Sequence, residues 1–218
     1  MASGAAKPVL CVEGQHDCFV VINLMMQHGV PWTKGREPVE IKDCKNDVGV
    51  LAAIQNEIDA AKGTGRAVGF VVDIDTTAGS RWSCVEKALK AVGLEPPTQP
   101  VDGGYVEEST TLKVRVGVWL MPDNKLHGGD LEDLLKTLLP VNDRLYAFAE
   151  ECSGHALSHG ATYADPKDRK KANLHCWLAW HEEPGMPYGQ AICRKYFESH
   201  SVEAAAFAAW FKSLFRIP

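Results

Sequence analysis

Short, continuous apolar runs alternate with longer amphipathic segments over the first two-thirds of the chain, and this alternation strongly limits the possible folds. The runs at 8–12, 67–72 and 114–121 are apolar at nearly every position, and a weaker run lies at 39–41. Continuous apolar runs are typical of strands that are buried on both faces of a parallel sheet. The pattern reads β-α-β-α-β-α-β-α and predicts an α/β fold with a mostly parallel sheet flanked by helices.

Four amphipathic segments follow these strands and are expected to be helices. The segment 17–29 carries Phe19, Ile22 and Met26 at helical spacing, and the segment 47–62 has one apolar face. A third helix is expected to follow Ser80, which is a suitable N-cap, and a short fourth helix is expected near Asp130. The region around 96–104, which contains Pro-Pro and Gly-Gly pairs, reads as a loop.

The remaining residues, 141–218, are expected to form a helical extension that packs on the α/β core of residues 1–140 in the same compact domain. Asp165-Pro166 has the residue types that begin a helix, as a cap and a first-turn proline. The last helix is expected to bury a run of large apolar side chains, namely Phe207, Trp210, Phe211, Leu214 and Phe215.

The composition allows a substantial core and disfavours several classes of protein. Hydrophobic residues make up 45% of the chain and charged residues 23%, which excludes a disordered protein. No apolar run is long enough to cross a membrane, the start of the chain lacks the plan of a signal peptide, and the seven cysteines form no C-x-x-C pair, so we expect a cytoplasmic protein. The net charge of −5 gives no general attraction to nucleic acid, so phosphate binding would require bound cations or a local basic patch.

Acidic residues directly follow two of the predicted strands. Glu13 follows the first strand and is succeeded by Gly14, and Asp73 and Asp75 follow the strand at 67–72. The carboxyl ends of parallel strands meet at one edge of the sheet, so these side chains are expected to converge there. Several carboxylates at one place repel one another, and protonation or a cation must relieve that repulsion; oxygen ligands of this kind suit Mg²⁺ or Mn²⁺. The pattern therefore predicts a divalent metal site.

The motifs Val12-Glu13-Gly14-x-x-Asp17 and Val71-Val72-Asp73-Ile74-Asp75 resemble those of a Toprim domain, the metal-binding module of topoisomerases, primases and related nucleases. Further segments are similar to a small, stand-alone Toprim-like prokaryotic family that is related to the OLD (overcoming lysogenization defect) nucleases. These segments are 117–124, 131–133, Lys171-Ala172, Trp177-x-x-Trp180 and Pro184-Gly185.

The resemblance implies metal-dependent phosphodiester hydrolysis, with phage defence or DNA repair as possible roles. It implies that Glu13, Asp73 and Asp75 hold a first Mg²⁺ or Mn²⁺ ion, and that Asp17 and Glu132 complete a second site. Glu13 is alternatively the general base. The ATPase domain of OLD proteins has no counterpart here, so a separate ATPase is an expected partner, beside DNA in preference to RNA.

Basic residues are needed near the phosphate in such a reaction, because they offset the negative charge that develops. Lys171 matches the late lysine of Toprim nucleases and is the candidate catalytic cation. The predicted contacts to the phosphate backbone are Arg81, Lys167, Arg169 and Lys170.

Two other functions are compatible with the same residues. One is a non-catalytic module that binds a metal together with a nucleotide or a partner protein, which the acidic net charge favours. The other is a phosphotransferase or phosphohydrolase that acts on small molecules. The motifs alone do not separate these alternatives from a nuclease.

Overall fold

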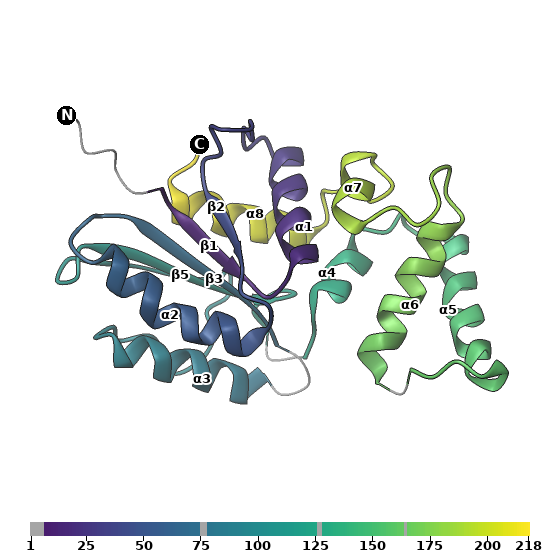
Figure 1. Ribbon diagram of the computed structural model, residues 1–218, viewed down its shortest axis with the longest axis horizontal. Helices are drawn as coiled ribbons and strands as arrows, with labels where there is room; N and C mark the ends of the chain where they lie inside the picture. The colour runs from purple at the N-terminus through teal and green to yellow at the C-terminus, as the bar shows by residue number, and fades with distance from the viewer. Residues whose placement is uncertain (1–6, 75–77, 126–127, 164) are drawn as a thin grey trace.

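A five-stranded sheet with the strand order β2-β1-β3-β5-β4 forms the centre of the molecule (Figure 1). The computed structural model describes residues 7–74, 78–125, 128–163 and 165–218. Neighbouring strands are parallel except for β4, which runs antiparallel to β5. The expected mostly parallel sheet is thereby confirmed. The strands are β1 (Val9–Val12), β2 (Glu40–Asp43), β3 (Ala67–Asp73), β4 (Tyr105–Ser109) and β5 (Val114–Met121).

Helices cover both faces of this sheet, as expected for an α/β fold. Helices α2 and α3 lie on one face and α1 and α8 on the other, while α5 and α6 lie beside each other beyond the end of the sheet (Figure 1). No helix in the described ranges is both long and apolar enough to cross a bilayer. The helices are α1 (Gln15–Gln27), α2 (Asp47–Ala61), α3 (Ala78–Ala91), α4 (Leu131–Thr137), α5 (Arg144–Ala156), α6 (Pro166–Ala179), α7 (Tyr188–Cys193) and α8 (Val202–Phe215), and a 3₁₀ turn spans Leu157–His159.

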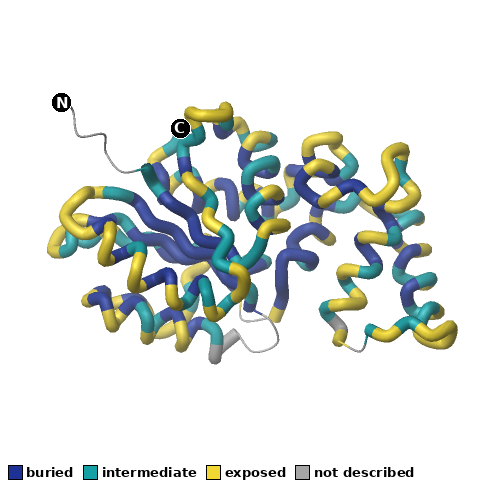
Figure 2. Tube along the Cα trace, in the orientation of Figure 1, coloured by how far each residue is buried: buried dark blue, intermediate teal, exposed yellow. Residues whose placement is uncertain are grey.

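Two hydrophobic clusters lie on the two faces of the sheet. In β1, Leu10 and Val12 belong to the cluster that contains α1 and α8, whereas Val9 and Cys11 face α2 and α3. Side chains alternate along a strand, so a strand covered on both sides is apolar at every position. Figure 2 shows the resulting buried strands between half-exposed helices. The cluster on the α1 side continues through α4 to the helices α5, α6 and α7.

Two details differ from the sequence-based expectations. Helix α1 begins at Gln15 and leaves Phe19 and Met26 exposed, at 49% and 44%, because a wider apolar stripe on the same helix faces the core. That stripe consists of Val20, Val21, Leu24 and Met25.

Strand β4 was not expected, because it is a short edge strand with two glutamates and has no continuous apolar run. Its first residue, Tyr105, is buried, and the Tyr105 carbonyl accepts a hydrogen bond of 3.0 Å from the Trp210 indole of α8. The C-terminal helix therefore also secures the edge of the sheet.

Two glycines allow α8 to approach the sheet closely. Gly69 of β3 and Gly117 of β5 are paired in register, and a Cβ atom at either position would lie 2.8 or 2.7 Å from the Leu214 Cδ2 atom. The paired glycines leave a groove that the fully buried Leu214 side chain fills. The last helix is thus an integral part of the central layers.

We expect Leu214→Ala to lower the free energy of unfolding by about 2–5 kcal/mol, because it removes buried contacts and leaves a cavity above the two glycines. Urea denaturation followed by circular dichroism measures this change as a lower midpoint with an unchanged slope. Val202→Ala on the same helix is the control, since Val202 is 81% exposed and its truncation should have almost no effect. An equal loss in both variants would contradict the packing role of Leu214.

Candidate metal centre

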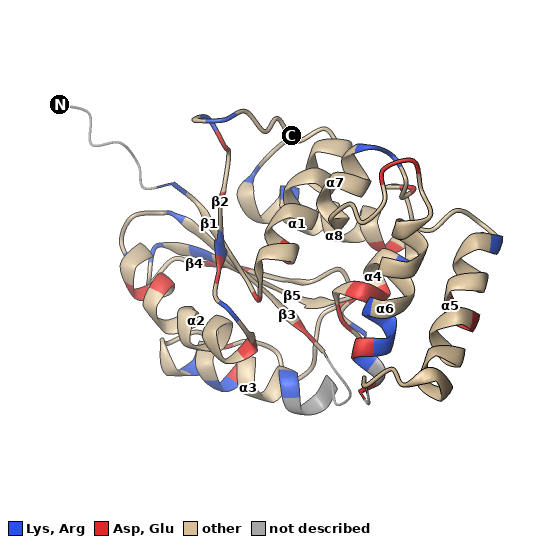
Figure 3. Cartoon of the chain, turned by 45° about the vertical axis from the view of Figure 1, so that its right-hand side comes forward, with Lys and Arg blue, Asp and Glu red and all other residues tan. Residues whose placement is uncertain are grey.

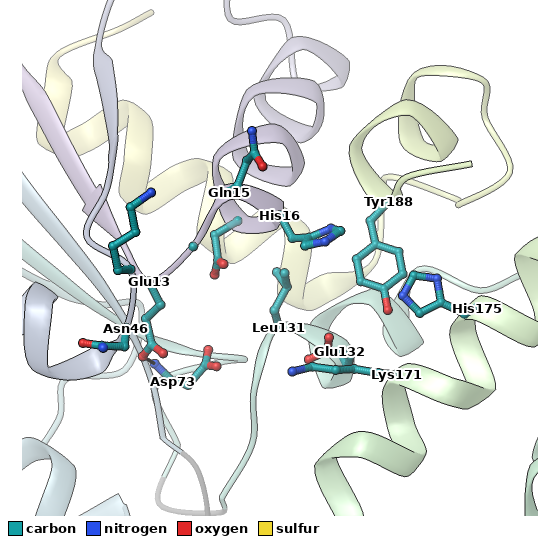
Figure 4. Close-up of a pocket in the computed structure, with 13 residues that line it drawn as sticks. Glu13, Gln15, His16, Asn46, Asp73, Leu131, Glu132, Lys171, His175 and Tyr188 are labelled. Carbon is teal, nitrogen blue, oxygen red and sulfur yellow. Dashed lines mark hydrogen bonds between the residues drawn. The ribbon is translucent and has the colours of Figure 1, made fainter. Parts of the chain in front are cut away.

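A pocket with a volume of about 380 Å³ lies at the carboxyl ends of β1 and β3, where it also meets α1, α4, α6 and α7 (Figure 4). Four of the predicted metal ligands line it, and they come from four separate elements or their ends. These carboxylates are Glu13, Asp17, Asp73 and Glu132. The structure therefore brings together acids that are up to 119 residues apart in the sequence.

The strand ends and the first turn of α1 place three of these acids. Glu13 follows β1 directly, and its Oε1 atom accepts a hydrogen bond of 2.8 Å from the backbone N–H of Asp73, the last residue of β3. Gly14 is the N-cap of α1, and a Cβ atom there would lie 3.3 Å from the Asp17 Oδ2 atom. The turn therefore allows the Asp17 carboxylate to lie against the backbone at the strand end.

Glu132 reaches the pocket from the start of α4. Asp130 caps this helix by accepting a hydrogen bond of 3.1 Å from the backbone of Asp133, and the Asp133 side chain accepts one from the backbone of Asp130 in return. This reciprocal arrangement fixes the first turn of α4. Glu132 is therefore held by a well-defined helix start.

The four carboxylates share an environment that disfavours their charged forms. Burial raises the pKa of Glu13, and it raises the pKa of Asp17 to about 6 and that of Glu132 to about 7. Burial also raises the pKa of Asp73 well above its ordinary value, and the charge of Glu13 raises it further. The Oδ1 atom of Asp73 is buried and has no hydrogen-bond partner among the described residues. A nearby positive charge would favour the charged forms of these carboxyls.

The carboxylates are not arranged around a single point. Within the described ranges, no group of three or more histidine, cysteine, aspartate or glutamate side chains has the geometry to hold a metal ion. One oxygen of Glu13 is engaged with the backbone of Asp73. The predicted ligand Asp75 lies outside the described residues.

Lys171 is the predicted basic residue that lines the pocket. It lies on α6, and its amine extends into the pocket beside Glu132 (Figure 4). Its charge lowers the pKa of Asp17 and of Glu132, although burial has the larger, opposite effect on both groups. In the described structure Lys171 forms no hydrogen bond or ion pair, so its amine is available to a bound anion.

The other predicted phosphate contacts have different surroundings. The Lys170 amine lies 3.0 Å from Asp130 Oδ2 and 2.5 Å from Asp133 Oδ2, and so joins α6 to the start of α4. Figure 3 shows basic segments of α6 beside the acidic start of α4. Arg169 approaches α5, where a Cβ atom at Gly154 would lie 2.9 Å from its Nη2 atom.

Arg81 and Lys167 do not line the pocket either. The Arg81 guanidinium donates a hydrogen bond of 2.6 Å to Asp47 Oδ2, and the charge of Arg81 lowers the pKa of Glu13. The charge of Lys167 lowers the pKa of Asp73. Both residues therefore influence the site through their charge.

Several residues of the pocket were missed by sequence reasoning. His16, His175 and Tyr188 form its aromatic side, and Lys45 and Asn46 reach it from the turn after β2. The strand order explains why this turn reaches the pocket, because β2 lies beside β1 and ends at the same edge of the sheet. The polar turn that follows the weak strand at 39–41 was the signal available in the sequence.

The raised pKa values of Asp17 and Glu132 predict how the stability of the metal-free protein depends on pH. Such carboxyls have pKa values of about 4 in the unfolded chain, so the folded state binds their protons more tightly. The stability that these two groups contribute is complete below about pH 4, and it is lost as the pH rises through about 6 and 7. Glu132→Gln should therefore match the wild type at about pH 4 and be more stable at pH 8, by on the order of 1–3 kcal/mol.

Thermal melts in EDTA across this pH range measure the difference. Glu182→Gln is the control, because Glu182 is exposed and does not line the pocket, and its stability should follow that of the wild type at every pH. A Glu132→Gln protein that is less stable than the wild type at pH 8 would contradict the burial of an ionised carboxylate.

Comparison with known proteins identifies the family of the chain. A search of curated proteins and a search of solved structures find no match. The sequence model of the family described as "Protein of unknown function (DUF3226)" matches residues 7–216, which is nearly the whole chain. The protein therefore belongs to this DUF3226 family.

Proposed function

We propose that the protein is a divalent-metal-dependent nuclease that hydrolyses phosphodiester bonds at the pocket on the carboxyl edge of the sheet. The observation that carries this proposal is the Asp73 carboxylate, which lies beside Glu13 and Asp17 and has a buried oxygen with no hydrogen-bond partner in the described part of the chain. A buried acid without a partner is costly, and acids of this kind are ordinarily paired or bind a metal.

The donor set fits Mg²⁺ or Mn²⁺, because it consists of carboxylate oxygens and contains no thiolate. Glu13, Asp17, Asp73 and Glu132 would hold the metal, and Asp75 remains a further predicted ligand. A bound divalent ion supplies electrostatic stabilisation to a phosphate group that is attacked by water. The raised pKa values of the four carboxyls support this proposal, because a positive charge would favour their ionised forms.

The protein groups around the cluster have complementary tasks in hydrolysis. Lys171 stands beside Glu132 and would bind a non-bridging phosphate oxygen, which offsets the charge that accumulates as water attacks phosphorus and the P–O bond to the leaving oxygen breaks. Glu13 is the alternative acceptor for the proton that the attacking water loses, since it lines the pocket beside Asp73.

The substrate that we favour is DNA, with RNA second, and the cellular setting that we favour is phage defence or DNA repair in the cytoplasm. These choices follow the Toprim resemblance. A separate ATPase partner belongs to the same hypothesis. The net charge of −5 means that a polynucleotide must be attracted locally, through Lys171 and the bound cation.

Cleavage assays test the proposal directly. Purified protein is incubated with supercoiled plasmid, linear DNA and RNA in Mg²⁺, Mn²⁺ or EDTA, and the wild type is compared with Glu13→Gln. We expect cleavage that requires the metal and is lost in the variant. Cleavage that persists in Glu13→Gln would point to a contaminant or another site, and an absence of cleavage of all polymers would refute the nuclease.

A second candidate is a non-catalytic module that binds a metal together with a nucleotide. It is favoured by one observation, namely that the described carboxylates are not already arranged around one ion. Calorimetric titration with Mn²⁺ and with nucleotides separates the two functions. Binding without turnover of DNA, RNA or nucleotides would support the module, and turnover of nucleotides alone would indicate a small-molecule phosphohydrolase.

A further inference from the structure

The hydroxyl group of Tyr188 is buried in the wall of the pocket without a partner. The Tyr188 side chain is 2% exposed and lines the pocket, and its hydroxyl forms no hydrogen bond with any described residue. A buried hydroxyl without a partner destabilises a protein, and a phenylalanine of the same shape would avoid that penalty. The hydroxyl is therefore expected to have a partner in another state of the protein.

The Tyr188 ring is held firmly in place by neighbouring elements. The His175 ring of α6 stacks on it with centroids 5.0 Å apart, and the His16 ring of α1 lies 5.5 Å away at an angle of 52°. The next residue, Gly189, lies directly against α1, where a Cβ atom would be 2.7 Å from the carbonyl carbon of Phe19. The hydroxyl therefore has a fixed position, and its partner must be a group that moves toward it.

Glu132 is the group that best meets this requirement. The Tyr188 hydroxyl points to the side of the pocket where Glu132 and Lys171 lie (Figure 4). Burial has the largest effect on the pKa of Tyr188 and the charge of Glu132 the next largest, and both raise it, so the hydroxyl remains a proton donor. Solvent does not reach the hydroxyl, which favours a protein carboxylate over a substrate atom as its acceptor.

We propose that Tyr188 is a positioning residue whose hydroxyl donates a hydrogen bond to the Glu132 carboxylate when a divalent cation is bound. This inference rests on the proposed metal site. A carboxylate that binds a cation with one oxygen keeps the other for a neighbour, and such neighbours orient the ligand and strengthen metal binding. The fixed hydroxyl would thus select the orientation of Glu132 that completes the site.

Mn²⁺ binding tests the inference without any activity measurement, through the electron paramagnetic resonance signal of free Mn²⁺. We expect Tyr188→Phe to weaken Mn²⁺ binding by roughly 10- to 100-fold. The same change in a Glu132→Gln background should have no further effect, because the acceptor carboxylate is already absent. The thermal midpoint of metal-free Tyr188→Phe should equal or exceed that of the wild type, which a purely structural role would not produce.

Tyr196→Phe is the matched control, since Tyr196 does not line the pocket and its hydroxyl only accepts a hydrogen bond of 3.4 Å from the backbone of Glu183. It should bind Mn²⁺ like the wild type. An unchanged affinity in Tyr188→Phe, or an equal loss with and without Glu132, would overturn the inference while leaving the metal site in place. A wild type that binds no Mn²⁺ would refute the metal site itself.

Discussion

Asp73→Asn is expected to abolish metal-dependent cleavage and, in the same protein, to stabilise the metal-free fold. The loss of activity should reach roughly 10²–10³-fold, since a metal contributes several kcal/mol to the stabilisation of charge at phosphorus. The gain in stability should be about 1–3 kcal/mol at pH 8, because the substitution removes a buried carboxylate that has an unpartnered oxygen. The hydrogen bond from the Asp73 backbone to Glu13 involves no side-chain atom of Asp73 and is retained.

Opposite changes in function and stability distinguish a functional acid from a structural one. Plasmid cleavage in Mn²⁺ gives the first quantity, and urea unfolding in EDTA gives the second. Asp102→Asn serves as the control because Asp102 is exposed in a loop before β4, and it should change neither quantity. An Asp73→Asn protein that is less stable than the wild type in EDTA would show that Asp73 has a structural role.

The acidic side of the pocket was predictable from the sequence because it depends on one topological rule. Parallel strands end at the same edge of a sheet, so acids that directly follow buried strands must lie near one another. Glu13 directly follows β1 and Asp73 is the last residue of β3. The Asp73 backbone N–H donates a hydrogen bond to the Glu13 carboxylate. Asp17 and Glu132 lie in the first turns of α1 and α4, and both of these helices begin at the same edge of the sheet.

The aromatic side of the pocket was not predictable in the same way. Tyr188 lies on a six-residue helix whose position depends on close packing between Gly189 and the backbone of Phe19, about 170 residues away in the sequence. Nothing local to 188–193 indicates that contact. The buried face of α1 was predicted wrongly for a related reason. The helix has two overlapping apolar stripes, and its rotation about its own axis, which its neighbours determine, decides which stripe is buried.

The sequence of the basic run at 167–171 does not indicate which neighbours each of its side chains contacts. Successive residues of a helix diverge by about 100° around its axis, so adjacent side chains meet different neighbours. Arg169 approaches α5, Lys170 joins the start of α4, and Lys171 extends into the pocket. A run of like charges therefore has several structural roles, and its members need separate tests.

Lys171→Met is expected to lower the rate of phosphodiester cleavage by roughly 10²-fold, because removing one preorganised donor to the reacting group typically costs that much. The methionine keeps most of the side-chain volume and removes the charge. Lys171 lines the pocket beside Glu132 but is not one of the residues that would hold the metal, so Mn²⁺ affinity should change only slightly. Single-turnover cleavage at saturating Mn²⁺ measures the rate separately from metal binding.

Lys170→Met is the matched comparison, because it removes the same charge one residue earlier in α6. Lys170 pairs with Asp130 and Asp133, so its loss should lower the free energy of unfolding by about 1–2 kcal/mol and leave the cleavage rate of the folded protein nearly unchanged. Equal effects of the two substitutions on cleavage would mean that the basic run acts through its total charge. A rate that falls only in Lys171→Met would place the phosphate beside Glu132, at the one lysine of the run that lines the described pocket.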